Sequence, residues 1–164
     1  MVRLASLEIH KEEFSFSAGH FTIFSATERE QLHGHNYYVS IAFKVAIEDY
    51  GLSFDYRHYK RKMSALCDQL DRHFLLPEQS RYLKLEENEE YLIAHFNHKK
   101  IPFLKEDVVT LPLTNITIEE LSHWFLQKIL EEQQQDIAQH GIRGITVKVY
   151  NGPGQSAATS WGDV

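Results

Sequence analysis

Three histidines at short spacing are the residues of this chain whose types could do chemistry together. His33 and His35 are separated by one residue, and His20 lies earlier in the chain. Histidines at positions i and i+2 of a strand project to the same side, and a third on a neighbouring strand can complete a tripod. Zn²⁺ binds such imidazole nitrogens, and three protein ligands leave one position for water or substrate. An isolated His-x-His pair also fits surface histidines that hold no metal.

The hydrophobic pattern predicts that two neighbouring strands position these histidines. Apolar residues occupy every second place from Tyr37 to Ile47, and His33 and His35 continue that alternation backwards. The segment over about 8–20 alternates in the same way and places the third histidine on its apolar parity. Alternation with a period of two residues is typical of a half-buried strand. Residues 22–31 are polar and irregular, which predicts a loop that could cover whatever the histidines hold.

The remaining segments complete an α+β pattern. Apolar residues at helical spacing predict helices over about 57–71 and 117–139, and Thr117 with Glu120 forms a capping-box signature for the second. Further strand-like runs predict a hairpin over 81–103, with Pro102 on an edge, and a last strand over 145–150 before a Gly/Pro/Ser-rich tail loop. We therefore predict an α+β fold with a mostly antiparallel sheet and helices on one side.

The composition favours a single folded domain over residues 1–164 in a reducing compartment. Lys and Arg number 17 against 23 Asp and Glu, and the net charge of −6 argues against nucleic acid or an anionic membrane as partner. The single cysteine, Cys67, cannot form an internal disulfide. Apolar runs stay well below the roughly 18 residues of a membrane span, and the first residues are too polar for a signal peptide. We therefore expect a cytoplasmic protein with neither a nucleic-acid nor a membrane partner.

Five short motifs occur along the chain in an order that one protein family shares. FSAGH and LHGHNYYV contain the three histidines, and three more motifs follow: GLSFDYRHYK at Gly51–Lys60, LDRHFL at Leu70–Leu75 and NITIEEL at Asn115–Leu121. Together they resemble the tunnelling-fold family of 6-pyruvoyl- and 6-carboxytetrahydropterin synthases. In that family the histidines of F-x-A-x-H and H-G-H bind zinc, which implies that His20, His33 and His35 bind Zn²⁺ here.

The resemblance also implies a fold, an assembly and a substrate class. Family subunits have a four-stranded antiparallel sheet with two helices on one face, and residues 81–103 would be an inserted hairpin. Subunits join their sheets around a tunnel, commonly as a homohexamer with active sites at subunit interfaces. The substrate is a 7,8-dihydropterin with a trihydroxypropyl side chain that usually bears triphosphate. Zinc acts as a Lewis acid on its hydroxyls, and a general base moves protons.

The sequence departs from the family at its catalytic residues. The usual base is a cysteine before H-G-H, but residues 25–32 contain none. Glu30 matches the E-x-x-H-G-H arrangement of a minority branch and is our candidate base, with Glu28 as a competitor. Asp71 stands at the aspartate of the family's Asp–His pair, but Arg72 replaces the histidine, and His73 follows one place later. We predict an Asp71–His73 relay; alternatively, His73 is a helix C-terminal histidine favoured by the helix dipole.

The substrate-binding residues are also altered. The glutamate that holds the pterin edge in the family is missing, and Asn151, or else Tyr150, lies near its place. Thr117 and Glu119 stand where a Thr and a Glu of the family contact pterin, although helix capping alone would also explain them. Cys67 follows a core-facing leucine in the first predicted helix, so we expect a small buried side chain without a catalytic role.

The sequence thus predicts a Zn²⁺-dependent pterin-converting lyase that acts on 7,8-dihydroneopterin triphosphate or a close relative. The branch with glutamate is associated with cleavage of the side chain to 6-hydroxymethyl-dihydropterin, which gives an alternative reaction with Glu30 as base. A different class of function is a zinc-containing protein that binds a pterin or purine without turnover. The missing cysteine, the displaced histidine and the missing late glutamate favour this last alternative.

Overall fold

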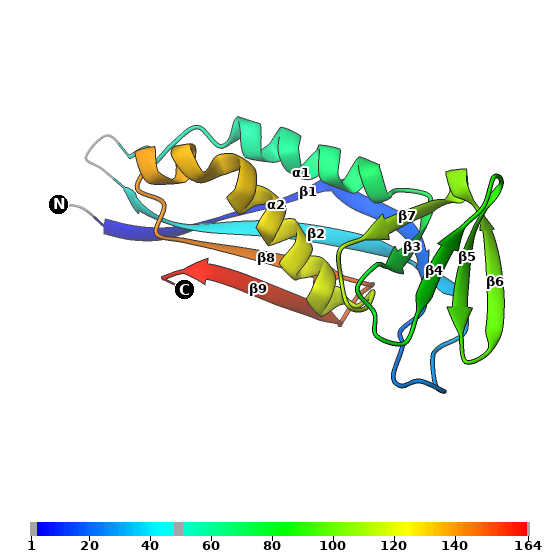
Figure 1. Cartoon of the computed structure of the whole chain (residues 1–164). Coiled ribbons are helices and arrows are strands. Elements are labelled where there is room, and N and C mark those ends of the chain that lie inside the picture. The colour runs from blue at the N-terminus through cyan, green and yellow to red at the C-terminus, as the bar shows by residue number, and fades with distance from the viewer. Residues whose placement is uncertain (1–2, 48–50, 164) are drawn as a thin grey trace.

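The computed structural model describes residues 3–47 and 51–163, with the architecture shown in Figure 1. Residues 1–2, 48–50 and 164 of the expected domain range lie outside this description. The elements are, in chain order, β1 (Arg3–His20), β2 (His33–Ile47), α1 (Arg57–Leu70), β3 (His73–Pro77), β4 (Lys84–Glu87), β5 (Tyr91–Phe96), β6 (Lys99–Leu104), a 3₁₀ turn (Lys105–Asp107), β7 (Val108–Leu111), α2 (Ile118–Gln139), β8 (Gly144–Tyr150) and β9 (Ser156–Gly162).

The larger sheet has the strand order β7-β3-β1-β2-β8-β9. Its four strands β1, β2, β8 and β9 pair antiparallel, which is the four-stranded sheet that the family resemblance implies. Two short strands extend it, because β3 runs parallel to β1 and β7 runs parallel to β3. The α+β class is confirmed, but the sheet is mixed and contains these two further strands. Both strands, β3 and β7, are too short for a hydrophobic alternation within their own sequence to predict them.

The segment after β8 differs from the predicted tail loop. Residues 151–155 do form a turn, but β9 then pairs with β8 from Ser156 to Gly162. The small and polar residues of β9 lack an apolar alternation, so its extended form depends on backbone hydrogen bonds to β8. Thr159 also contacts α2, since its Oγ1 lies 2.7 Å from the Oγ of Ser122.

One face of the larger sheet carries the main hydrophobic core. Of the β2 side chains that the alternation predicts to be buried, Ile47 is only partly buried, and the others are at most 1% exposed: Tyr37, Val39, Ile41, Phe43 and Val45. Both helices cover this face, with α1 packed against β1 and α2 against β8 and β9 (Figure 1). β1 begins at Arg3, earlier than the predicted 8, and its register with β2 shifts between His10 and Ser15.

The two helices lie where the sequence predicts them. Thr117 caps α2, since its Oγ1 accepts a hydrogen bond from the Glu120 N–H at 3.3 Å. The Glu120 carboxylate turns away to Thr114, accepting from its N–H at 3.2 Å and its hydroxyl at 3.1 Å, so the reciprocal half of the capping box is replaced. In the described part of the chain, neither helix has the length and apolar character needed to cross a lipid bilayer.

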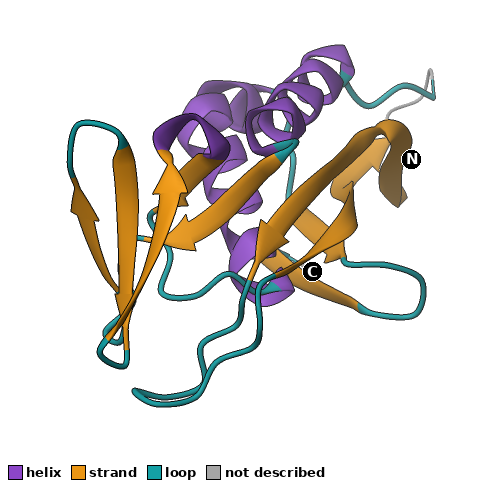
Figure 2. Ribbon diagram, turned by 90° about the vertical axis from the view of Figure 1, so that its right-hand side faces the viewer, coloured by secondary structure: helices purple, strands orange, loops and turns teal. Residues whose placement is uncertain are grey.

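The predicted hairpin over 81–103 is a three-stranded antiparallel sheet of order β4-β5-β6. Asn97 and His98 have φ of 47° and 62°, the left-handed geometry of a two-residue hairpin turn. Pro102 lies on β6, an edge strand, as predicted. Figure 2 shows this small sheet standing at one side of the larger one. A second apolar cluster joins it to β3 and the segment after β1, and it contains Phe21, Ile23, Leu76, Leu83, Leu92, Ala94 and Phe96.

Candidate metal centre and active site

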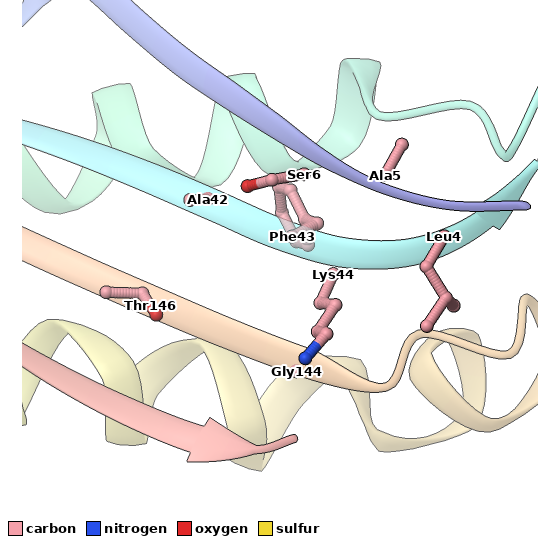
Figure 3. Close-up of a pocket in the computed structure, with 8 residues that line it drawn as sticks. All are labelled: Leu4, Ala5, Ser6, Ala42, Phe43, Lys44, Gly144 and Thr146. Carbon is pink, nitrogen blue, oxygen red and sulfur yellow. The ribbon is translucent and has the colours of Figure 1, made fainter. Parts of the chain in front are cut away.

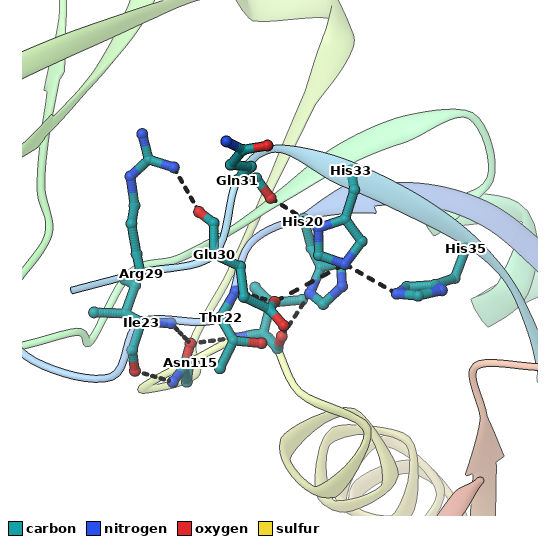
Figure 4. Close-up of polar contacts among 10 residues, drawn as sticks. His20, Thr22, Ile23, Arg29, Glu30, Gln31, His33, His35 and Asn115 are labelled. Atoms are coloured by element: carbon teal, nitrogen blue, oxygen red, sulfur yellow. Dashed lines mark hydrogen bonds and ion pairs between the residues drawn. The ribbon is translucent and has the colours of Figure 1, made fainter.

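The three predicted ligands meet where the core face of β1 and β2 ends. His20 pairs directly with His33 in the antiparallel register, and His35 stands opposite Ala18. One ligand nitrogen of each histidine lies within 4.8 Å of the others. The Nε2 atoms of His33 and His35 are 3.1 Å apart, and Figure 4 shows the rings turned toward one another. This convergence fits one metal ion held by three imidazoles.

Backbone carbonyls orient two of the rings. His20 Nδ1 lies 2.8 Å from the carbonyl oxygen of Ile116, and His33 Nδ1 lies 2.8 Å from that of Gln31. A ring that donates Nδ1–H to a carbonyl carries its lone pair on Nε2, as a metal ligand requires. His20 Nε2 is buried and lacks a hydrogen-bond partner, and a metal ion would satisfy it. The nitrogen donor set and its carbonyl supports therefore fit zinc.

The electrostatics favour neutral rings at His20 and His35. Burial lowers the pKa of His20, the hydrogen bond to Ile116 opposes this effect, and the neighbouring His33 and His35 lower the pKa further. Burial and the neighbouring His33 also lower the pKa of His35. Neutral imidazole is the form that binds a metal. Among the residues that the structure describes, this is the only group of three His, Cys, Asp or Glu side chains that converges in this way.

Glu30 lies beside the cluster on the loop between β1 and β2 (Figure 4). Its Oε2 accepts a hydrogen bond from the Thr22 N–H at 2.9 Å and lies 3.9 Å from Nε2 of His33. Its own N–H donates to the Thr22 carbonyl at 2.9 Å, so the two residues hold each other across the loop. Burial raises the pKa of the Glu30 carboxyl, but the hydrogen bonds from Thr22 and the neighbouring His33 and His20 together bring this pKa below its usual value. The carboxylate is therefore an ionised proton acceptor.

The histidine cluster and Glu30 line one cavity of about 330 Å³. Thr117 and Glu119 reach it from the start of α2, and Asn151 reaches it from the turn after β8. The structure thus brings these predicted substrate-binding residues together with the predicted ligands and base. The competing candidates Glu28 and Tyr150 are absent from the lining of this cavity.

Four further lining residues, Thr22, Tyr37, Ile118 and Gln155, were not predicted. Tyr37 follows His35 by two positions on β2, so the alternation that located the histidines could have located it. Its ring centroid lies 5.6 Å from that of His35, and burial raises its pKa, so the hydroxyl stays protonated. Gln155 had no comparable signal, because it lies in the turn that precedes β9.

Asp71 and His73 lie outside this cavity. Asp71 caps α1, accepts a hydrogen bond from the Ser17 N–H at 2.8 Å and pairs with Arg72 at 3.2 Å. His73 begins β3, and its buried Nδ1 lacks a hydrogen-bond partner. His73 and Arg72 line a different hollow, which shares His35 with the histidine cavity. Within one chain, the structure therefore separates the predicted relay from the predicted base.

Two features elsewhere lack groups suited to catalysis. Cys67 is fully buried in the core, and burial raises the pKa of its thiol to about 12, so the reactive thiolate does not form near neutral pH. A separate cavity lies near the other end of β1 and β2, where Leu4 and Phe43 contribute to its lining (Figure 3). Lys44 is its single charged lining residue, so the cavity contains no acid–base pair.

Known proteins were compared with the sequence and with the structure. A protein of Methanocaldococcus jannaschii, provisionally named 6-carboxy-5,6,7,8-tetrahydropterin synthase, is 27% identical over 143 residues, which are 87% of this chain and 86% of that protein. The 6-pyruvoyltetrahydropterin synthase of Plasmodium vivax superposes with a TM-score of 0.91 at 30% identity, covering 98% of this chain and 99% of that chain. A variant structure of that enzyme, with a TM-score of 0.91 at 29% identity and the same coverage, replaces a glutamate called a catalytic residue by alanine.

The sequence profile of 6-pyruvoyl tetrahydropterin synthase matches residues 8–161 of the chain. This range includes both helices, all three histidines, Glu30 and the other predicted site residues. The chain therefore belongs to the 6-pyruvoyl tetrahydropterin synthase family.

Proposed function

We propose that this protein is a zinc-dependent lyase that converts 7,8-dihydroneopterin triphosphate or a close relative. The observation that carries the proposal is one cavity in which three histidine nitrogens converge beside the ionised carboxylate of Glu30. A metal at His20, His33 and His35 would supply Lewis-acid polarisation of the substrate's side-chain hydroxyls. The other groups of the cavity would bind the pterin and move protons.

Glu30 is the proposed general base. Its Oε2 is 3.9 Å from Nε2 of His33, so a substrate hydroxyl next to the metal would also lie close to this carboxylate. The hydrogen bond from the Thr22 N–H fixes the orientation of the carboxylate and keeps it ionised. The catalytic glutamate of the P. vivax relative supports this role, because Glu30 provides a carboxylate where the family's usual cysteine is missing.

The start of α2 is the proposed pterin-binding end of the cavity. Glu119 offers a carboxylate that can accept two hydrogen bonds from the N–H groups of a pterin edge. Thr117 Oγ1 already accepts from the Glu120 N–H, and its hydroxyl hydrogen remains available to the ligand. Asn151, in the turn after β8, would add a carbonyl acceptor and N–H donors to the same cavity.

A second copy of the chain would have to bring Asp71 and His73 to the site. Because both residues lie outside the cavity of their own chain, we propose that they serve as a relay in a neighbouring subunit of a cytoplasmic homo-oligomer. The family resemblance, which implies active sites at subunit interfaces in a hexamer, supports this arrangement.

Cleavage of the side chain to 6-hydroxymethyl-7,8-dihydropterin is the second candidate reaction, and Glu30 is the observation that favours it. A carboxylate that removes a hydroxyl proton beside a C–C bond promotes breakage of that bond. Elimination of triphosphate requires instead that a proton leave carbon. The products differ in mass, so one assay distinguishes the two reactions.

Zinc-loaded wild-type protein and Glu30→Gln would be incubated with 7,8-dihydroneopterin triphosphate, and the products followed by mass spectrometry. We expect turnover by the wild type and a loss of about 10²–10⁴ in kcat for Glu30→Gln, because the amide cannot accept the proton. Bound zinc should stay stoichiometric in both proteins, since Glu30 is not one of the three histidine ligands.

Glu28→Gln is the matched control, because Glu28 lies on the same loop but is exposed and outside the cavity. It should retain wild-type kcat. Full activity of Glu30→Gln would refute the base assignment. Tight binding of dihydropterins by the wild type without turnover of any of them would refute the lyase and leave a non-catalytic pterin-binding protein.

A further inference from the structure

Asn115 connects two segments that meet beside the candidate site. Its Oδ1 accepts hydrogen bonds from the N–H groups of Ile23 and Ile116, each at 3.1 Å. Its Nδ2 donates to the carbonyl of Ile23 at 2.8 Å. Figure 4 shows this amide between the loop after β1 and the segment that leads into α2. All the hydrogen-bonding groups of the Ile23 backbone are therefore held by one side chain.

Each segment that Asn115 holds carries part of the site. The carbonyl of Ile116 lies 2.8 Å from Nδ1 of His20 and orients that ring. On the loop side, Ile23 directly follows Thr22, whose N–H donates to Oε2 of Glu30 at 2.9 Å. Asn115 thus directly precedes Ile116, which orients His20, and its hydrogen-bond partner Ile23 directly follows Thr22, which orients Glu30.

We propose that Asn115 is a positioning residue that sets the placement of Glu30 relative to the metal ligand His20. This inference rests on the proposed function, because it assumes that a metal and a carboxylate base act together. The side-chain amide of Asn115 couples Glu30 to His20 through its hydrogen bonds to Ile23 and Ile116. In this role Asn115 itself contacts neither the substrate nor the metal.

A primary amide of this length is needed for these contacts. It pairs with the N–H and the carbonyl of Ile23 as a neighbouring strand would, and its oxygen holds the Ile116 N–H as well. An aspartate keeps the two accepted hydrogen bonds but cannot donate to the Ile23 carbonyl when ionised. An alanine loses all three bonds, so the two variants should form a graded series.

The test compares zinc affinity and steady-state kinetics for wild type, Asn115→Asp and Asn115→Ala. Zinc affinity is measured by competition with a chromophoric chelator, which needs no turnover. We expect Asn115→Ala to weaken zinc binding about 10-fold and to lower kcat by about 10–100-fold with little change in KM, as residues that orient metal ligands typically do. Asn115→Asp should lie between Asn115→Ala and wild type.

A double variant tests the coupling to Glu30. In the Glu30→Gln background, Asn115→Ala should lower kcat much less than in the wild type, because the base that it positions is already absent. Its effect on zinc affinity should remain. Equal kcat losses in both backgrounds would overturn the coupling.

Thr114→Ala is the matched control. Thr114 directly precedes Asn115, and its replacement removes the hydrogen bond from its hydroxyl to the Glu120 carboxylate. The hydrogen bonds of Asn115 to Ile23 and Ile116 remain. Thr114→Ala should keep wild-type zinc affinity and kcat. If Asn115→Ala behaves like this control, or if Thr114→Ala loses as much as Asn115→Ala, the inference fails while the proposed function stands. A wild-type protein that binds no zinc would overturn the proposed function itself.

Discussion

His20 occupies a position that the pattern of β1 assigns to the hydrophobic core. Phe14, Phe16 and Ala18 precede it on the same face, and His20 is itself only 5% exposed. Leaving a buried polar atom such as its Nε2 without a partner costs about 1–3 kcal/mol. A metal ion bound to Nε2 would remove this cost. The burial that disfavours an unpaired imidazole would therefore favour metal binding at His20.

Replacing His20 by alanine should therefore abolish stoichiometric zinc binding. His10→Ala is the matched control, since His10 lies on the same strand but is exposed and outside the cavity. Metal content after dialysis should be one zinc per chain for wild type and His10→Ala and near zero for His20→Ala. A chelator should lower the melting temperature of the first two only, because an ion that binds the folded state stabilises it. Stoichiometric zinc in His20→Ala would contradict the assignment.

The two helices are linked at the end away from the site by Asp136 of α2. Tyr59 of α1 is fully buried, and its hydroxyl donates to Oδ2 of Asp136 at 2.8 Å. Burial and this hydrogen bond raise the pKa of Tyr59. His58 Nε2 and His140 Nδ1 lie 3.2 and 3.1 Å from the same carboxylate. Asp136 thus contacts two residues of α1 and the residue that ends α2, and an ion pair between Lys62 and Glu132 is a second polar link between the helices.

Asp136→Ala should lower the free energy of unfolding by about 1–3 kcal/mol, because the buried hydroxyl of Tyr59 would lose its partner. Urea unfolding measures this change. Glu131→Ala removes an exposed i,i+3 ion pair with Lys128 from the same helix and should change stability by less than about 0.5 kcal/mol. Zinc affinity should be unchanged in both variants. Equal stability of the two variants would show that the Asp136 contacts contribute nothing specific.

The larger sheet is open at both edges, where β7 and β9 each have a neighbour on one side only. Unpaired strand edges favour association with further chains. The proposed relay residues Asp71 and His73 also lie outside the cavity of their own chain. The open edges fit the proposed homo-oligomer, and because family members are commonly hexamers, we expect a mass near six times the 19.2 kDa of one chain by light scattering.

Mixing two inactive variants tests whether the site is shared between copies. Glu30→Gln and Asp71→Asn would be unfolded together, refolded and assayed. If each site takes Glu30 from one subunit and Asp71 from another, roughly a quarter of the sites in a random mixture contain both native residues. Roughly a quarter of the wild-type activity should then return. No recovery from mixed oligomers would place both residues in the same subunit, and an Asp71→Asn variant that is active by itself would exclude Asp71 from the reaction.

Sequence alone determined the features that depend on local geometry. Side chains of a strand alternate between two faces whatever the partner strand is, so the positions of His33 and His35 relative to Tyr37 and Val39 could be read directly. The cap at Thr117 is likewise set within a few residues. The family motifs added the expected substrate class, and hydrophobic periodicity gave the order of most elements.

Tertiary structure decided the features that depend on contacts between distant segments. The sequences of β9, β3 and β7 contain no hydrophobic alternation that predicts a strand. β9 is extended because it pairs with β8, β3 because it pairs with β1, and β7 because it pairs with β3. The separation of Asp71 and His73 from Glu30 follows from where β3 docks. Asn115 bonds to Ile23, 92 residues away, and local propensity holds no information about such a contact, because chain folding alone brings the two segments together.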